Sequence, residues 1–209
     1  YANLKDKMVR SVLETPDEAV FVGCDDGIFK SVDGGKSWKQ VFTDGMVRNL
    51  VAANGVLIGS GIKGVVRSTD GGEHWDWGLT EAGLAQKTGI LGDRIVAISR
   101  HMPEQLKRNP LDKGSTIHVS ADGGQSWQLI DGPQLVYNVA KGLAPIRDIY
   151  DVQQLGAYLF CSCEAGLFRS SDQGKSWKLV LALPTTNPMM FNFTISGQVI
   201  YAAPVFGGC

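Results

Sequence analysis

The chain has 209 residues and a formal net charge of −1, with 44% hydrophobic and 20% charged residues. This balance is typical of one globular domain spanning residues 1–209, and the lack of a strong positive field argues against nucleic-acid binding. No apolar run reaches the length of a membrane span. No segment shows a sustained helical period, so nearly the whole chain is predicted to be β-structure.

Short apolar segments separated by turn residues predict strands in repeating units of four, which we call strands A to D. In the first unit they are Met8–Glu14, Ala19–Cys24, Gly27–Ser31 and Ser37–Phe42. In the second they are Met46–Ala52, Val56–Ser60, Val65–Ser68 and Trp75–Leu79. The third contains B at Arg94–Ser99 and C at Ser115–Ser120, and the fourth contains A to C at Ile146–Val152, Ala157–Cys163 and Leu167–Ser170. Strands A and B of another unit follow at Met190–Ile195 and Gln198–Ala203.

One motif, Ser-x-Asp-x-Gly-x-[Ser/His]-Trp, follows strand C in each of the four units. The aspartate can accept hydrogen bonds from backbone N–H groups of a turn, and the glycine allows a positive φ. The tryptophan can close the end of a small apolar layer. The motif therefore predicts a hairpin turn with a structural role, and a calcium or carbohydrate site in the turn is the less favoured alternative. Its aspartate and tryptophan residues are Asp33 and Trp38, Asp70 and Trp75, Asp122 and Trp127, and Asp172 and Trp177.

The four aspartates recur at intervals of about 37 to 52 residues, which is the period of a propeller blade. The chain is therefore predicted to be an all-β, five-bladed β-propeller, with strands Met190–Ile195 and Gln198–Ala203 beginning the fifth blade. Tyr1–Leu4 aligns with the strand D segment Lys39–Phe42. We expect it to be the outer strand of the fifth blade, where it would close the ring and hide two sheet edges.

The four turns resemble the Asp-box repeat, also called the bacterial neuraminidase (BNR) repeat, and the resemblance covers essentially the whole chain. Families with this repeat include sialidases, β-glucanases that act on xyloglucan, the sortilin ectodomain, photosystem II assembly factors and several sugar-binding propellers. One fold hosts many activities, so the resemblance does not select one of them. Sialidases also need a tyrosine nucleophile helped by a glutamate, an aspartate acid–base and an N-terminal Phe/Tyr-Arg-Ile-Pro motif. This chain lacks that motif, so no catalytic residue is carried over.

Superposing the units aligns three arginines, Arg10, Arg48 and Arg147, near the start of strand A. The third unit has Ala85 there, and the fifth has approximately Phe191. Strand A is the innermost strand of a propeller blade, so these side chains are predicted to converge at the mouth of the central channel, opposite the Asp turns. A guanidinium group binds carboxylate or phosphate through two hydrogen bonds. The alternatives, an anion- or sugar-binding cluster and ion pairs with neighbouring acidic residues, both stay open.

Loops on the arginine side supply further candidate ligand-binding residues. Asp26, Lys63 and Glu164 lie in loops between strands B and C, and Tyr150 lies within the predicted strand A of the fourth unit. The third unit has a long insertion in its B–C loop, residues 100–114, which is predicted to be a surface flap over the channel mouth.

Cysteine is sparse, with Cys24, Cys161, Cys163 and Cys209 in the chain. Cys24 and Cys163 occupy equivalent positions at the end of strand B, and small buried thiols are the simplest interpretation. A disulfide to Cys209 is possible in an exported protein, but the pairing cannot be deduced from the sequence. Neither the cysteine spacing nor the three histidines form a metal-binding pattern, so we expect no metal and no cofactor.

The sequence favours a non-enzymatic binding module that holds a glycan, or an anionic group of a protein partner, through Arg10, Arg48 and Arg147. A glycoside hydrolase and an assembly or scaffold factor are the alternatives. Because the chain begins with Tyr1 instead of Met, a removed leader and a secreted or periplasmic location are expected. Neither the ligand nor the oligomeric state follows from these patterns.

Overall fold

The computed structural model describes residues 4–100, 114–130, 132, 148–184 and 189–206. Across these ranges the regular elements are all β-strands. They are β1 (Val9–Glu14), β2 (Val20–Cys24), β3 (Gly27–Ser31), β4 (Lys39–Phe42), β5 (Val47–Ala53), β6 (Val56–Gly61), β7 (Gly64–Ser68), β8 (Asp76–Trp77), β9 (Leu84–Leu91), β10 (Arg94–Arg100), β11 (Ser115–Ser120), β12 (Gln128–Ile130), β13 (Ile149–Leu155), β14 (Tyr158–Cys163), β15 (Gly166–Ser170), β16 (Lys178–Ala182), β17 (Met190–Ser196) and β18 (Val199–Val205).

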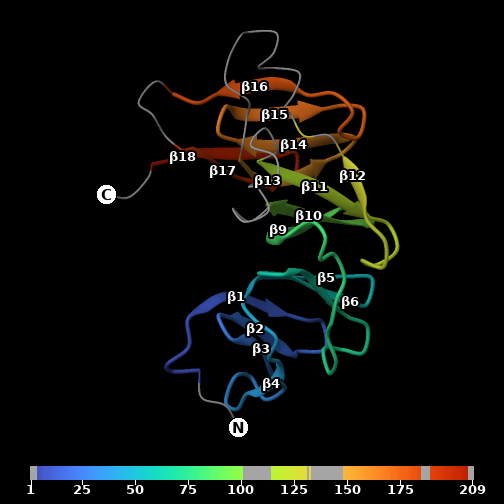
Figure 1. Ribbon diagram of the computed structural model, residues 1–209. Coiled ribbons are helices and arrows are strands. Elements are labelled where there is room, and N and C mark those ends of the chain that lie inside the picture. The colour runs from blue at the N-terminus through green and yellow to red at the C-terminus, as the bar shows by residue number, and fades with distance from the viewer. Residues whose placement is uncertain (1–3, 101–113, 131, 133–147, 185–188, 207–209) are drawn as a thin grey trace.

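The strands form four four-stranded antiparallel sheets in chain order, which we call the first to fourth blades: β1–β4, β5–β8, β9–β12 and β13–β16. Strands β17 and β18 form a two-stranded hairpin. Figure 1 shows the blades following one another along an arc, with this hairpin beside β13 and β14. The predicted all-β class with repeated four-stranded units is therefore confirmed.

Some strand boundaries differ from those predicted. The sequence predicts strand A of the fourth blade at Ile146–Val152, but β13 begins at Ile149, which is paired with Cys163. The outer strand of the second blade contains only Asp76 and Trp77. Beyond Trp77 the contact with β7 continues outside the regular ladder, since the Gly78 N–H donates to the Val65 carbonyl (2.7 Å).

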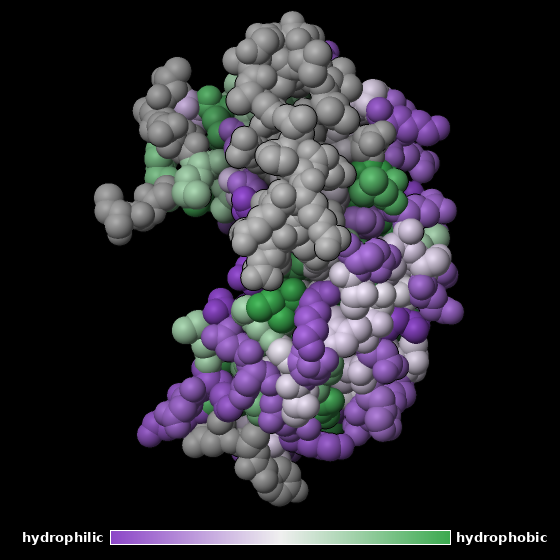
Figure 2. Space-filling model, viewed as in Figure 1, coloured by the Kyte–Doolittle hydropathy of each residue, from purple (hydrophilic) through white to green (hydrophobic). Residues whose placement is uncertain are grey.

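The predicted closing strand Tyr1–Leu4 falls mostly on residues 1–3, which lie outside the described part of the chain, and Leu4 itself is not in a strand. Within the described ranges β18 pairs with β17 and with no other strand. In Figure 1 the β17–β18 hairpin lies apart from the first blade, and Figure 2 shows a hollow in the outline between them.

The hydrophobic core is divided into layers between successive blades. In the layer between the first and second blades, Phe21 of β2 meets Trp75 edge-on, with ring centroids 6.3 Å apart, and both side chains are buried. The same cluster includes Val47 and Leu50 of β5. Each blade is therefore stabilised chiefly by burial against its neighbours.

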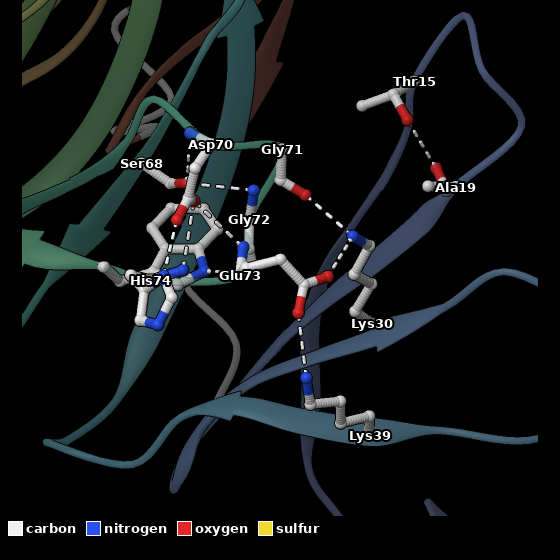
Figure 3. A network of polar contacts seen from close by, with 11 residues as sticks. Thr15, Ala19, Lys30, Lys39, Ser68, Asp70, Gly71, Gly72, Glu73 and His74 are labelled. Atoms are coloured by element: carbon white, nitrogen blue, oxygen red, sulfur yellow. Dashed lines mark hydrogen bonds and ion pairs between the residues drawn. The ribbon is translucent and has the colours of Figure 1, made fainter.

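Each Asp turn is closed by hydrogen bonds of one pattern. In the second turn, the Ser68 hydroxyl donates to Asp70 Oδ1 (2.8 Å), and the backbone N–H groups of Gly72 and His74 donate to Ser68 Oγ (2.9 Å) and Asp70 Oδ1 (3.0 Å). The turn is also hydrogen-bonded to the preceding blade: Lys30 Nζ of the first blade donates to the Gly71 carbonyl (2.9 Å) and to Glu73 (2.6 Å). Figure 3 shows this network, in which Glu73 reaches Lys30 and Lys39 of the first blade.

The turn carboxylates make stability depend on pH in the acid range. A hydrogen bond from the Ser37 hydroxyl lowers the pKa of Asp33 to about 2, and one from the Ser176 hydroxyl lowers the pKa of Asp172 to about 2. An unfolded aspartate titrates near about 3.9. The stability that these groups contribute is therefore complete above about pH 4 and is lost as the pH falls toward about 2. Tm measured from neutral pH downward should fall mainly in this window, and an Asp33→Asn variant should show a shallower fall. A constant Tm between pH values of about 4 and about 2 would contradict the assignment.

Candidate functional site

The same irregularity occurs near the start of the innermost strand in all four blades. Pairing of β1, β5 and β13 with the next strand skips one residue, and in the third blade the skipped residue lies on β9. A β-bulge of this kind leaves one residue unpaired and redirects its side chain. The bulged residues are Arg10, Arg48, Gln86 and Tyr150.

This register corrects the predicted alignment in two blades. Tyr150 of β13, and not Arg147, occupies the position equivalent to Arg10 and Arg48. In the third blade the position is held by Gln86, because Ala85 is buried and paired with Ser99. Arg147 itself lies outside the described residues, so its predicted role stays a prediction.

Arg10 has an acidic partner on its own blade. Its Nε forms an ion pair with Asp25 in the loop between β2 and β3, and one of its terminal nitrogens lies 3.2 Å from the sulfur of Met8. The hydrogen bond between Arg10 and Asp25 raises the pKa of Arg10 and lowers the pKa of Asp25. Lys7 and Asp26 form a similar ion pair beside it. Thus Arg10 and the candidate residue Asp26 are both held in pairs within the first blade.

Arg48 differs from Arg10. In the described part of the chain its guanidinium has no ion pair, and its Nε is buried without a hydrogen-bond partner. The pKa of Asp25 is lowered mainly by its hydrogen bond to Arg10 and by the charge of Arg10, and to a smaller extent by the charge of Arg48. Arg10, Asp25 and Arg48 therefore lie in one region. A guanidinium carries five N–H donors and no acceptor. Arg48 is therefore a partly buried cation with unused donors.

Tyr150 lies among charged groups of the third and fourth blades. Burial raises the pKa of Tyr150, and the negative charges of Asp148 and Glu164 raise it further. Arg100, at the end of β10, pairs with Asp148 across the two blades (3.2 Å). The phenol therefore stays protonated at neutral pH and can donate or accept a hydrogen bond.

Polar contacts between neighbouring innermost strands were not found by the sequence analysis. Lys87 of β9 pairs with Asp151 of β13 (2.8 Å), and Asn49 of β5 accepts hydrogen bonds from the Thr88 backbone N–H (2.9 Å) and hydroxyl (2.8 Å). A signal was present, because the residue after every bulge is polar. These residues are Ser11, Asn49, Lys87 and Asp151.

Lys63, another predicted ligand-binding residue, has an acidic and an aromatic neighbour. It pairs with Asp44 and lies over the ring of Trp77, 5.7 Å from the centroid. Trp77 belongs to β8, the outermost strand of the second blade, and its indole N–H donates to Asp44 (2.7 Å). The structure thus places Lys63 toward the outer edge of its blade.

The cysteines and the possible metal ligands carry no reactive site in the described residues. Cys24, Cys161 and Cys163 are free and buried, and burial raises the pKa of Cys163 to about 11. Cys24 and Cys163 hold equivalent positions at the ends of β2 and β14, and Cys209 lies outside the described residues. Within these ranges no three His, Cys, Asp or Glu side chains come together as a metal site.

A cavity of about 300 Å³ lies between the first and second blades, at the end that carries the Asp turns. Its lining includes Phe21, Asn54, Leu57 and Gly71. The bulged arginines lie at the opposite end of the innermost strands, since the start of β1 pairs with the end of β2. The cavity is therefore separate from the arginine site.

No protein-family model and no curated protein matches the chain. Among solved structures, the chain is similar to an ancestral GH74 enzyme with a TM-score of 0.68 and 17% identity, and the match covers 93% of this chain and 27% of that one. The GH74 xyloglucanase from Xanthomonas campestris matches with a TM-score of 0.60 and 18% identity, over 84% of this chain and 30% of that one. The extracellular domain of a one-component system from B. thetaiotaomicron matches with a TM-score of 0.63 and 14% identity, over 92% of this chain and 24% of that one.

At sequence identities this low, the similarity to these structures is a similarity of fold. Together with the four blades, it defines the chain as a β-propeller protein. The chain spans less than a third of the length of each of the three proteins. Among the described residues there is no helix of the length and apolar character that crossing a membrane requires.

Proposed function

We propose that this propeller is a non-enzymatic binding module that recognises an acidic glycan, or another anionic group of a partner, at the bulged ends of its innermost strands. The supporting observation is the state of Arg48, whose buried Nε has no partner among the described residues. A partly buried cation with unsatisfied donors is costly, and an anion that accepts its hydrogen bonds removes that cost.

The neighbouring groups supply the rest of the proposed recognition. Arg10 is already neutralised by Asp25, whereas Arg48 has no ion pair among the described residues. Tyr150 and Gln86 occupy the equivalent positions in the next two blades and can bind hydroxyl groups. The proposed ligand therefore has one anionic end and several hydroxyls, and an acidic sugar has this chemistry. Arg147, Lys63, Asp26 and Glu164 stay as predicted contributors around it.

Replacing Arg48 with alanine should weaken binding of an acidic sugar about tenfold to a hundredfold, because hydrogen bonds to a charged group are lost. Isothermal titration with a sialic or uronic acid measures this, and the wild-type affinity should fall as salt is raised. Lys178→Ala is the matched control, since it removes one exposed positive charge from β16, away from the site.

Two results would count against the proposal. One is an affinity that Arg48→Ala leaves unchanged, and the other is an equal loss with Lys178→Ala, which would indicate a general effect of net charge. If a neutral glycan binds as tightly as an acidic one, the negative charge of the ligand does not contribute to binding, and the proposed role of Arg48 is wrong.

A glycoside hydrolase is the second candidate function, favoured by the structural likeness to GH74 enzymes. A sialidase-like mechanism would need an activated tyrosine, whereas the pKa of Tyr150 is raised by burial and by nearby carboxylates. Turnover of chromogenic glycosides tests for this activity. An assembly or scaffold role would use the same surface for a protein partner, which a pull-down would identify.

We further propose that the four turns are Asp boxes, that a fifth blade completes the ring, and that the domain is exported. The repeated serine and aspartate hydrogen bonds support the first proposal. The β17–β18 hairpin supports the second, because it supplies strands A and B of another blade. The similar extracellular domain from B. thetaiotaomicron supports the third.

A further inference from the structure

The cavity between the first and second blades lies where two repeat positions carry small side chains. Ala19, just before β2, is buried in the core cluster between these blades, and Ala52 of β5 lines the cavity. The register of the A–B hairpins aligns each alanine with a larger residue in the next two layers. The aligned residues are Val56 and Ile90 between the second and third blades, and Arg94 and Gln154 between the third and fourth.

The second and third Asp turns show the effect of this difference. A Cβ on Gly123 of the third turn would lie 3.1 Å from Val56 Cγ2, so that turn is in close contact with the valine. A Cβ on the equivalent Gly71 of the second turn would have no atom within 4 Å beyond its chain neighbours, because Ala19 holds the valine position. Gly71 lines the cavity. The smaller side chain of Ala19 therefore leaves space in front of the second turn.

The cavity has an apolar interior and a polar opening. Phe21 and Leu57 line it and are 1% and 5% exposed. Asp17 and Asn54 also line it but are exposed, so these two residues lie at its opening. An engineered apolar cavity of about 150 Å³ holds benzene. The volume of about 300 Å³ found here is therefore sufficient for one ring with a short chain.

The charge at the opening is negative. A hydrogen bond with Thr15 lowers the pKa of Asp17, so this carboxyl group is ionised at neutral pH. Among the described residues Asp17 forms no ion pair, since the nearby Lys30 is paired with Glu73 (2.6 Å). The amide nitrogen of Asn54 donates to a backbone carbonyl (3.4 Å), which leaves its side-chain oxygen as a second acceptor. The opening therefore offers hydrogen-bond acceptors and a negative charge to a ligand.

We propose that this cavity binds a small organic ammonium ion, with its apolar ring against Phe21 and Leu57 and its ammonium group at Asp17 and Asn54. Burial of the ring supplies the hydrophobic part of the affinity, and the charge-assisted hydrogen bond to Asp17 selects the cation. The cavity lies at the opposite end of the innermost strands from Arg48. The proposal is therefore independent of the acidic ligand proposed above.

The 2-phenylethylammonium ion is a direct probe of this site. Titrated into the full ¹⁵N-labelled chain, it should shift the amide signals of Asn54, Gly55 and Gly71 saturably, with a Kd of about 0.1–1 mM. The neutral 2-phenylethanol has the same ring and should bind about tenfold more weakly. Arg48→Ala should leave the affinity for the ammonium probe unchanged, which separates this site from the anion site.

Two kinds of variant test the proposed contacts. Asp17→Asn removes the charge and should weaken binding of the ammonium probe about tenfold, whereas the matched control Glu18→Gln removes a neighbouring charge outside the lining and should bind like the wild type. Ala52→Leu fills the cavity and should abolish binding, as should Ala19→Val, which introduces the residue that the second blade has at this position. Tm of both filling variants shows that they are folded.

Four results would overturn the proposal. The first is the absence of saturable shifts up to about 10 mM probe, and the second is an equal affinity for 2-phenylethanol. The third is an equal loss of affinity in Glu18→Gln and Asp17→Asn, which would indicate a general effect of net charge. The fourth is an unchanged affinity in a folded Ala52→Leu or Ala19→Val variant, which would place the bound ammonium ion outside the cavity.

Discussion

Trp75→Ala should lower the free energy of unfolding by about 3–5 kcal/mol, as expected for removing a large buried aromatic side chain. Trp75 is 9% exposed, packs edge-on against Phe21 of the first blade and donates its indole N–H to the Gly72 carbonyl. The change therefore opens a void between two blades and leaves the turn less constrained. Denaturant unfolding followed by circular dichroism measures the loss.

Trp75→Phe is the matched variant. It retains most of the ring packing and removes only the indole hydrogen bond, so its cost should be clearly smaller. A Trp75→Ala loss below about 1 kcal/mol, or equal losses for both variants, would show that packing between the blades contributes little here.

Gly72→Ala should be strongly destabilising, for two separable reasons. Gly72 has φ of 81°, in the left-handed region, where an L residue costs about 1–2 kcal/mol. A Cβ on Gly72 would also lie 2.3 Å from Phe21 Cε1, so the two blades would have to move apart. Overpacking of this kind adds about 1–3 kcal/mol.

Gly71→Ala separates these two contributions. Gly71 has φ of 70°, and a Cβ on it would meet open space, with no atom beyond its chain neighbours within 4 Å. This variant therefore carries the backbone cost alone. Denaturant midpoints of the two variants give the difference. If both variants unfold at the same denaturant concentration, the clash of the added Cβ with Phe21 does not contribute to the free energy of unfolding.

The repeat architecture could be predicted because its determinants are local. Strand β3 is predicted at Gly27–Ser31 and has those bounds, since the hairpin after it is set by neighbouring residues such as Ser31 and Asp33. Closure could not be tested in the same way, because the proposed strand falls on residues 1–3. The shortness of β8 was not predicted, since only the structure shows that its regular pairing with β7 is limited to Asp76 and Trp77.

The candidate site was predicted less well, because a β-bulge changes register without leaving a clear pattern in the sequence. The segment Ile146-Arg147-Asp148 has the apolar-Arg-polar pattern of the first two units, yet the pairing of Ile149 with Cys163 gives the bulged position to Tyr150. Lys87 and Asp151 both follow a bulge, but they lie on different blades, so their polar character does not identify them as partners of each other. The sequence likewise does not show that the Arg48 guanidinium has no ion pair among the described residues, because this depends on which side chains surround it in the folded chain.

The hydrogen bonds that join the second and third Asp turns to the blade before each of them have a consequence for folding cooperativity. Lys30 donates to the Gly71 carbonyl of the second turn, and Arg67 donates to the Gly123 carbonyl of the third. Each blade is thereby coupled to its neighbour, as in a one-dimensional chain of nearest-neighbour interactions. Amide hydrogen exchange should accordingly be slowest in the second, third and fourth blades, which have strands packed on both sides among the described residues, and faster in the two-stranded β17–β18 hairpin.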